Sequence, residues 1–303
     1  MFFKNVAIYQ VTHKAFFEDL EKQLETNLND FVFKALGSQD LQKQGWVSPL
    51  PCGELLTHIA DGRIMLALKE EHVVLPADAV KKELAARVAA IELEQGRKVK
   101  KKEKDSLKED IVISLLPRCF TKSSITYAYL SPKQQTFVVD AGSFSAAEKL
   151  ISYLRKTLGS FPVVPPQSKN QLDVLMTDWL VKKEHPATFE VMSNAKLASA
   201  LQGGGKVTFK DEALFSDEVL AHVSADKFVT EIGLRNENLS FTLTETLHLK
   251  SVKFDDVLQE QNEDIDKDDA AARFDADFAL MAGTLDRTVE QLFTVLNVIE
   301  MEE

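Results

Sequence analysis

The sequence predicts an α+β fold, because segments with strand periodicity and segments with helix periodicity are mixed along the chain without regular βαβ alternation. Two further observations agree with this class. The chain has 303 residues, 45% of them hydrophobic and 27% charged, which allows a large core to be buried. No run approaches the ~18 apolar residues that a membrane span requires. At the N-terminus, apolar and polar residues alternate too soon to form the apolar core of a secretory signal peptide. We therefore expect a soluble, cytoplasmic protein.

In the first half of the chain, alternating apolar and polar residues predict strands, and apolar residues at helical spacing predict helices. The strands cover 3–11, 63–69, 125–130 and 136–139. The helices cover 15–27, 77 to about 104, and 144–158, the last of which is ended by Gly159.

The second half repeats this mixture. Segments 228–234 and 239–243 form a predicted hairpin, 247–254 adds a strand, and a long helix closes the chain over 274–299. The GGGK sequence at 203–206 is typical of a turn that enters a strand, which we interpret as an exposed finger. We predict three regions: 1–75 with 119–165 as a central α+β region, 76–118 as a basic helical projection, and 166–303 as a second α+β region with a C-terminal helix.

Charge is distributed very unevenly. The net charge is −11, yet residues 81–122 hold twelve Lys/Arg against seven Asp/Glu. The segment 255–277 has the opposite balance, with ten acids and two bases. A short basic stretch in an acidic protein indicates an anionic partner, and nucleic acid is the first candidate.

The basic stretch 97–108 reads RKVKKKEKDSLK, with seven basic residues in twelve positions. On one continuous helix, Arg97, Lys101, Lys104 and Lys108 would share a single stripe. Ser106 followed by Glu109 has the form of a capping box, which predicts a helix break near Asp105. A solvated helix face without any ligand explains the composition equally well.

Other candidate sites have weaker support. Asp264, Asp266 and Asp268 have the spacing that begins an EF-hand loop, but Asp269 stands where that loop needs Gly and Asp275 where it needs Glu. Several carboxylates in 264–277 would also suit Mg²⁺-dependent phosphodiester cleavage, although an acidic helix start explains them without chemistry. The two cysteines, Cys52 and Cys119, are expected to be buried small apolar residues.

Several motifs together resemble the RdgC family, the bacterial recombination-associated proteins. They cover the chain in order: GSQD (37–40) with GWVSP (45–49), LTHIADG (56–62), EKDSLKED (103–110), LLPRCF (115–120), LRKTLGSFPVVP (154–165), QNEDIDKDD (261–269) and RFDADFALM (273–281). The resemblance implies a horseshoe-shaped α+β subunit with antiparallel sheets and long helices, whose homodimer closes a ring around duplex DNA. It also implies sequence-independent DNA binding, nucleoid association, restraint of RecA, and neither a catalytic residue nor a cofactor or metal.

From charge and resemblance together, we expect a set of basic residues to contact DNA phosphates. These are Arg97, Lys98, Lys100, Lys101, Lys102, Lys104 and Arg118, with Lys206 and Lys210 on the finger as further candidates. Phe120 matches the family position of an apolar contact between subunits, whereas plain core packing is the commoner role of a Phe.

The expected partners are double-stranded DNA, with single-stranded DNA left open, and a second copy of the chain; RecA filaments are antagonised and no membrane is involved. Two alternatives remain open, a metal-dependent nuclease that uses the acidic cluster at 264–277 and an acidic adaptor that binds only protein.

Overall fold

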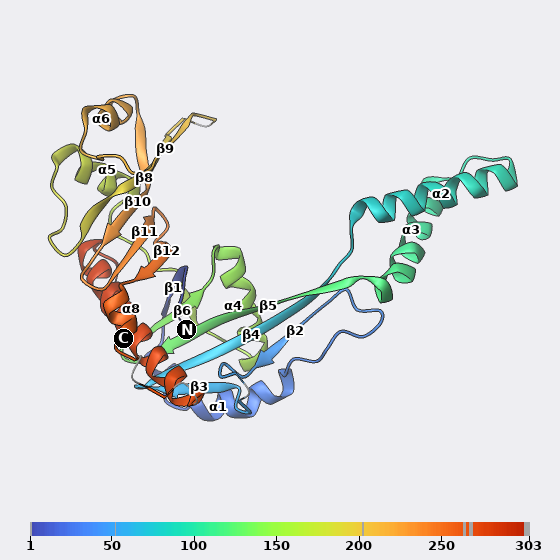
Figure 1. Ribbon diagram of the computed structural model, residues 1–303, viewed down its shortest axis with the longest axis horizontal. Helices are drawn as coiled ribbons and strands as arrows, with labels where there is room; N and C mark the ends of the chain where they lie inside the picture. The colour runs from blue at the N-terminus through green and yellow to red at the C-terminus, as the bar shows by residue number, and fades with distance from the viewer. Residues whose placement is uncertain (1, 52, 202, 263–264, 267–268, 300–303) are drawn as a thin grey trace. The chain divides into compact units, whose positions relative to one another are not determined.

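The computed structural model describes residues 2–51, 53–201, 203–262, 265–266 and 269–299 (Figure 1). The chain divides into two compact units. The first consists of residues 1–28, 48–66 and 126–303, and the second of residues 29–47 and 67–125. The fold is α+β with a large antiparallel sheet, as the sequence predicts. The predicted three-region division stays a prediction.

The first unit contains most of the strands. They are β1 (Val6–Val11), β3 (Thr57–Ala60), β6 (Thr136–Asp140), β7 (Val163–Val164), β8 (Glu190–Ser199), β9 (Lys206–Phe209), β10 (Lys227–Arg235), β11 (Leu239–Thr244) and β12 (His248–Phe254). Its helices are η1 (Lys14–Phe17, 3₁₀), α1 (Leu20–Asn27), α4 (Phe144–Leu158), α5 (Leu172–Lys182), α6 (Asp217–Ser224), α7 (Asp256–Glu260) and α8 (Ala270–Val295).

The second unit contains a strand, two helices and a short 3₁₀ turn. They are β2 (Gln42–Val47), α2 (Ala77–Gln95), α3 (Lys101–Leu115) and η3 (Leu116–Arg118). Three elements contribute residues to both units: η2 (Leu28–Phe31, 3₁₀), β4 (Arg63–Val74) and β5 (Phe120–Ser131).

The core of the first unit forms between its strands and helices α5 and α8. All six residues of β1 are buried, because β1 is an inner strand that pairs antiparallel with both β6 and β12. Beyond β12 the strand order continues β11, β10, β8, β9. Helix α8 lies along these strands (Figure 1) and buries Phe274, Phe278 and Met281, the side that the sequence predicts. This burial follows from apolar residues at helical spacing.

Helix α4 begins and ends at the predicted residues. The Ser143 side chain accepts a hydrogen bond from the backbone N–H of Ala146, which caps the helix start. Gly159 follows the last helical residue with φ 79°, a backbone conformation that side chains with a Cβ rarely adopt. Strong local end signals explain why the sequence alone locates this helix.

The second unit is built on a strand pair and a helical hairpin. Strand β2 pairs antiparallel with β4, and Trp46 in this pair is fully buried. A Cβ on Gly45 would lie 2.3 Å from the backbone Cα of Phe33, so only glycine fits there. Helices α2 and α3 lie side by side (Figure 1).

Candidate nucleic-acid interface

The basic segment 97–108 begins in the turn between α2 and α3, and its helical break differs from the predicted one. Helix α2 ends at Gln95, Gly96 follows with φ 60°, and α3 starts at Lys101. The break predicted near Asp105 is wrong, because Ser106 lies within α3. Glycine in the left-handed conformation ends a helix more effectively than an internal Ser-x-x-Glu pattern starts one. The predicted stripe therefore loses Arg97 and keeps Lys101, Lys104 and Lys108 on α3.

The turn is held by two contacts that fix its backbone. Val99 is buried, with 6% of its surface exposed, and its backbone N–H donates to the Glu92 carboxylate at 3.0 Å. Arg97 makes two hydrogen bonds to Glu103, each 2.8 Å long, from Nη1 and Nη2. These hydrogen bonds raise the pKa of Arg97 and lower the pKa of the Glu103 carboxyl. Arg97 is thus partly neutralised within the protein.

The lysines of the segment are exposed to solvent. They are Lys98, Lys100, Lys101, Lys102, Lys104 and Lys108. Lys100 is the N-cap residue of α3, and Lys101, Lys102 and Glu103 follow in its first turn. Cations at a helix N-terminus are unfavourable, because the positive end of the helix dipole lies there as well. Glu103 is the only acid in this first turn. The start of α3 is therefore a site of concentrated positive potential.

Arg118 and Phe120 lie close to each other in sequence where η3 leads into β5. Arg118 is exposed, as a phosphate-binding residue must be. Phe120 has 87% of its surface exposed, so the alternative of plain core packing is wrong for this chain. Exposing a large aromatic ring to water costs free energy unless a partner covers it. Between them, Cys119 is half-buried, and Cys52 lies outside the described residues.

The two finger lysines belong to the first unit. Lys206 begins β9 and Lys210 follows its end; both are exposed. Lys206 lines a cavity of about 330 Å³ together with Lys196 and Lys250, which sequence reasoning missed. Isolated lysines on strands give no sequence signal, because only sheet pairing brings β8 and β12 near one another.

The carboxylate of Glu231 lies within this cavity. Lys250 Nζ and Lys196 Nζ lie 3.1 Å and 3.4 Å from Glu231 Oε1. Burial opposes ionisation of Glu231, but the two lysines outweigh it and lower the pKa of its carboxyl. The cavity thus combines three lysines, two of them bound to Glu231, with a second carboxylate, Glu245, and with the hydroxyl groups of Thr230, Thr244 and Thr246. Lysines and hydroxyl groups commonly contact phosphate.

The acidic cluster does not form a metal site in the part of the chain that the structure describes. No group of three or more metal-ligating side chains is found among the described residues. Asp264 and Asp268 lie outside them. Asp275 Oδ1 lies 3.1 Å from His58 Nε2, and Asp277 Oδ1 accepts a hydrogen bond from Asn262 at 3.0 Å. These two acids therefore already have partners within the fold.

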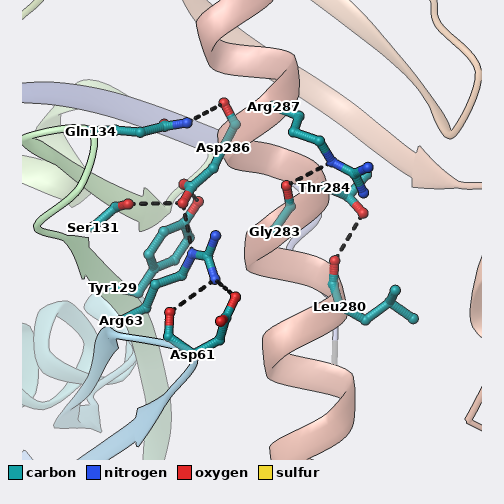
Figure 2. Close-up of polar contacts among 10 residues, drawn as sticks. All are labelled: Asp61, Arg63, Tyr129, Ser131, Gln134, Leu280, Gly283, Thr284, Asp286 and Arg287. Atoms are coloured by element: carbon teal, nitrogen blue, oxygen red, sulfur yellow. Dashed lines mark hydrogen bonds and ion pairs between the residues drawn. The ribbon is translucent and has the colours of Figure 1, made fainter.

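One buried polar cluster, which the sequence does not predict, surrounds Asp286 on α8 (Figure 2). Arg63 Nε donates to Asp286 Oδ2 at 2.6 Å, and Tyr129 Oη donates to Asp286 Oδ1 at 2.9 Å. Ser131 Oγ donates to Oδ2 at 2.8 Å. Burial, followed by the Asp286 charge, raises the pKa of Tyr129 well above 10. The cluster has satisfied hydrogen bonds and links α8 to the strands, which indicates a structural role.

Within the described ranges, no helix is both long enough and apolar enough to cross a bilayer.

Comparison with known proteins places these features in context. A family model described as "Putative exonuclease, RdgC" matches residues 1–299. A protein named "Recombination-associated protein RdgC" from Psychromonas ingrahamii is 54% identical over 291 residues, which are 95% of this chain and 96% of the relative. Proteins of the same name from Aeromonas hydrophila and Proteus mirabilis are 45% and 42% identical over 298 residues, 98% of each chain. The relatives are named for recombination and not for an enzymatic reaction.

Proposed function

The chain belongs to the RdgC family, and from this membership we propose that it binds DNA without sequence preference, encircles the duplex as a ring-shaped homodimer, and restrains the access of RecA to DNA. The observation that carries the DNA-binding part is the exposed lysine cluster at the start of α3. Point charges on a helix terminus meet the phosphate backbone and read no base edges, so the expected affinity is independent of sequence.

The energetics of α3 support an anionic partner. The lysines of its first turn repel one another and the helix dipole, while Glu103 is already bound to Arg97. A phosphate placed there relieves both repulsions. The free protein therefore carries an unfavourable charge arrangement that DNA binding would compensate.

The net charge of −11 is consistent with this proposal. A ring needs positive charge only on the surface that faces DNA, and an acidic exterior reduces unspecific adhesion to nucleic acid. Lys206 supplies a second candidate phosphate contact in the first unit, whereas Lys196 and Lys250 in the same cavity are bound to Glu231.

Homodimer formation is supported by exposed apolar residues of the second unit. Among the described residues, large apolar side chains are exposed in both units, and those of the second unit are Val32, Leu41, Val74, Leu93, Ile113, Phe120 and Ile125. Phe120 is our proposed subunit contact, because its aromatic ring is almost fully exposed at the start of a strand.

The DNA-binding proposal is tested by replacing Lys98, Lys100, Lys101 and Lys102 together with Ala. Arg97 is left unchanged because Glu103 holds it. We expect affinity for unrelated duplexes to fall by similar factors, and the slope of log K against log salt to flatten by about 3 to 4, near 0.9 for each lost phosphate contact. Electrophoretic mobility shifts at several salt concentrations measure both.

The matched control replaces four exposed lysines of the first unit, Lys22, Lys149, Lys156 and Lys183, and so removes the same charge. An equal loss in the control would mean that only net charge matters. Unchanged affinity and slope in the α3 variant would refute the assignment of these lysines.

Encirclement has its own test, retention on closed circular and linear DNA after a high-salt wash. A closed ring stays on circular DNA and slides off the ends of linear DNA, whereas a surface binder leaves both equally.

For RecA, prior addition of the protein should slow filament assembly on DNA in proportion to the DNA it covers; equal assembly rates would contradict this step.

A nuclease is the second candidate, because the matching family description contains the word exonuclease. Its carboxylates would come from the segment 264–277. Incubation of end-labelled linear DNA, and separately of circular DNA, with Mg²⁺ or Mn²⁺ decides between the two functions. Cleavage that is lost on Asp266→Ala would support the nuclease, and intact DNA over hours would leave binding as the function.

A further inference from the structure

One ion pair lies within the basic segment 97–108. Arg97 Nη1 and Nη2 each donate to one carboxylate oxygen of Glu103, and both hydrogen bonds are 2.8 Å long. The side chains of the six lysines in this segment form no hydrogen bond or ion pair with the part of the chain that the structure describes. The protein therefore neutralises the only arginine of the segment and leaves its lysines free.

The geometry of this pair is the geometry that arginine uses for phosphate. A guanidinium presents its N–H groups in a fixed fork, and carboxylate and phosphate groups both accept two of them side by side. Because both Nη atoms of Arg97 donate to Glu103, the end of the fork is occupied. A phosphate can take this end of the fork only after the Glu103 carboxylate has moved away.

The pair is accessible from solvent, which makes such an exchange possible. The side chains of Arg97 and Glu103 are 46% and 33% exposed, whereas those of the buried pair Arg63 and Asp286 are 13% and 4% exposed. Exposed ion pairs are weak and open readily. The hydrogen bond from Arg97 lowers the pKa of the Glu103 carboxyl, so Glu103 stays charged at neutral pH and attracts Arg97 as a phosphate would.

Other contacts hold the turn in place, so the pair is not needed for its structure. Val99 is 6% exposed, and its backbone N–H donates to the Glu92 carboxylate at 3.0 Å. The Glu103 carboxylate also accepts a hydrogen bond from the backbone N–H of Lys100, the N-cap residue of α3. A glutamine at position 103 keeps an oxygen for this bond but lacks the charge that attracts Arg97.

We propose that Glu103 competes with DNA phosphate for Arg97, and so holds the affinity for DNA below the value that the basic segment can reach. This role rests on the DNA-binding function proposed above. The lysines attach the protein to DNA, and Arg97 adds a tighter contact whenever a phosphate displaces Glu103. A pair that is closed about four-fifths of the time lowers the affinity by up to about fivefold.

Glu103→Gln tests the competition. We expect its affinity for duplex DNA to rise about fourfold, because Arg97 is then free to meet a phosphate. Mobility shifts at a fixed salt concentration measure the change. The matched control is Asp105→Asn, which removes the same charge from an exposed position of α3 that has no ion pair with any described residue. It should raise the affinity by less than about twofold, since only screened, general repulsion is removed.

A double-mutant cycle separates competition from a general effect of charge. Arg97→Ala should weaken DNA binding about threefold in the unaltered protein and about tenfold in the Glu103→Gln background, where the full contact is available. In the Asp105→Asn background it should cost about threefold again, because Glu103 still competes there.

Three results would overturn the proposal. They are an equal cost of Arg97→Ala in all backgrounds, a gain in Glu103→Gln no larger than in Asp105→Asn, and weaker binding of Glu103→Gln, which would mean that Glu103 orients Arg97 toward phosphate. If the four-lysine variant loses affinity while Glu103→Gln gains none, only this proposal fails. If the unaltered protein and Glu103→Gln both fail to bind DNA, the proposed function fails with it.

Discussion

At the scale of single residues, Asp286 shows how a charge is kept inside this fold. It is 3% exposed, and its carboxylate receives hydrogen bonds from Arg63, Tyr129 and Ser131. Buried pairs add little net stability compared with apolar residues, but removing one partner leaves the other uncompensated. The cluster therefore matters mainly when it is broken.

We expect Asp286→Ala to lower the free energy of unfolding by about 4 kcal/mol, because the Arg63 guanidinium, with 13% of its side chain exposed, would lose its main counter-charge. Chemical denaturation measures the loss. The control is Asp178→Ala, which removes an exposed partner of Lys182 and should change stability little. Similar losses in both variants would show that Asp286 acts as an ordinary surface charge.

His248 gives the fold a dependence on pH. It is 2% exposed, and its Nε2 lies 2.7 Å from the Ala141 carbonyl. Burial lowers the pKa of His248 below 6.5, against the effect of the hydrogen bond to Ala141, and the nearby Lys250 lowers it further. The unfolded chain therefore binds a proton at a higher pH than the folded one. Stability is lost as the pH falls from 6.5 through the folded pKa.

His248→Gln should reduce this loss, because glutamine does not titrate and its amide N–H can donate to the same carbonyl. The measurement is the free energy of unfolding at about pH 7.5 and about pH 5. The variant should show a smaller difference between the two pH values than the unaltered protein. An equal difference would assign the pH dependence to other groups.

At the scale of elements, the lysines at the start of α3 are proposed to favour DNA binding but lower the stability of the helix. Lys102→Glu puts an acid in the first turn of the helix, where the dipole favours it, and should raise the free energy of unfolding by about 0.5 kcal/mol. The same change should weaken DNA binding severalfold, since it reverses a proposed phosphate contact. Lys34→Glu, an exposed residue of the same unit outside any helix, should not stabilise. A loss of stability in Lys102→Glu would contradict the dipole argument.

Elements with strong local signals are those that the sequence predicts well. Helix α4 has Ser143 at its start, Gly159 at its end and a clear apolar face, and its predicted range matches the structure. The predicted break near Asp105 is wrong because two local signals compete, and Gly96 outweighs the Ser106 pattern. Helix α5 is hard to predict from the sequence, because the adjacent residues Trp179 and Leu180 are both buried and the apolar residues therefore do not follow a clear helical spacing.

The candidate sites also differ in how well the sequence alone predicts them. The lysines of α3 are consecutive in sequence, so composition alone indicates them. The cavity beside Lys206 joins Lys196 and Lys250, which are far apart along the chain, and no pattern links them before the sheet forms. Exposure of Phe120 is likewise a property of the fold, because sequence favours burial for this residue type.

At the scale of the whole molecule, self-association is the property that most needs measurement. Phe120→Ala should leave the free energy of unfolding of the subunit nearly unchanged, because the Phe120 side chain is 87% exposed. If this side chain is a central contact between subunits, the change should raise the dimer dissociation constant about 30-fold. Analytical ultracentrifugation over a range of concentrations measures it. Leu55→Ala, at 73% exposure in the first unit, is the control. If the unaltered protein proves to be a monomer, the proposed ring-shaped homodimer is excluded.

The pairing of β1 with β12 has a consequence for synthesis on the ribosome. Val6 pairs with Leu249, so the apolar N-terminal strand emerges long before this partner does. At translation rates of about 5–20 residues per second the delay is roughly 10 to 50 s. Strand β6 can pair with one edge of β1 earlier, but the other edge of this apolar strand stays unpaired until β12 is made and is exposed to aggregation during that time. Truncated products that lack the last third of the chain should accordingly be found in the insoluble fraction of the cell.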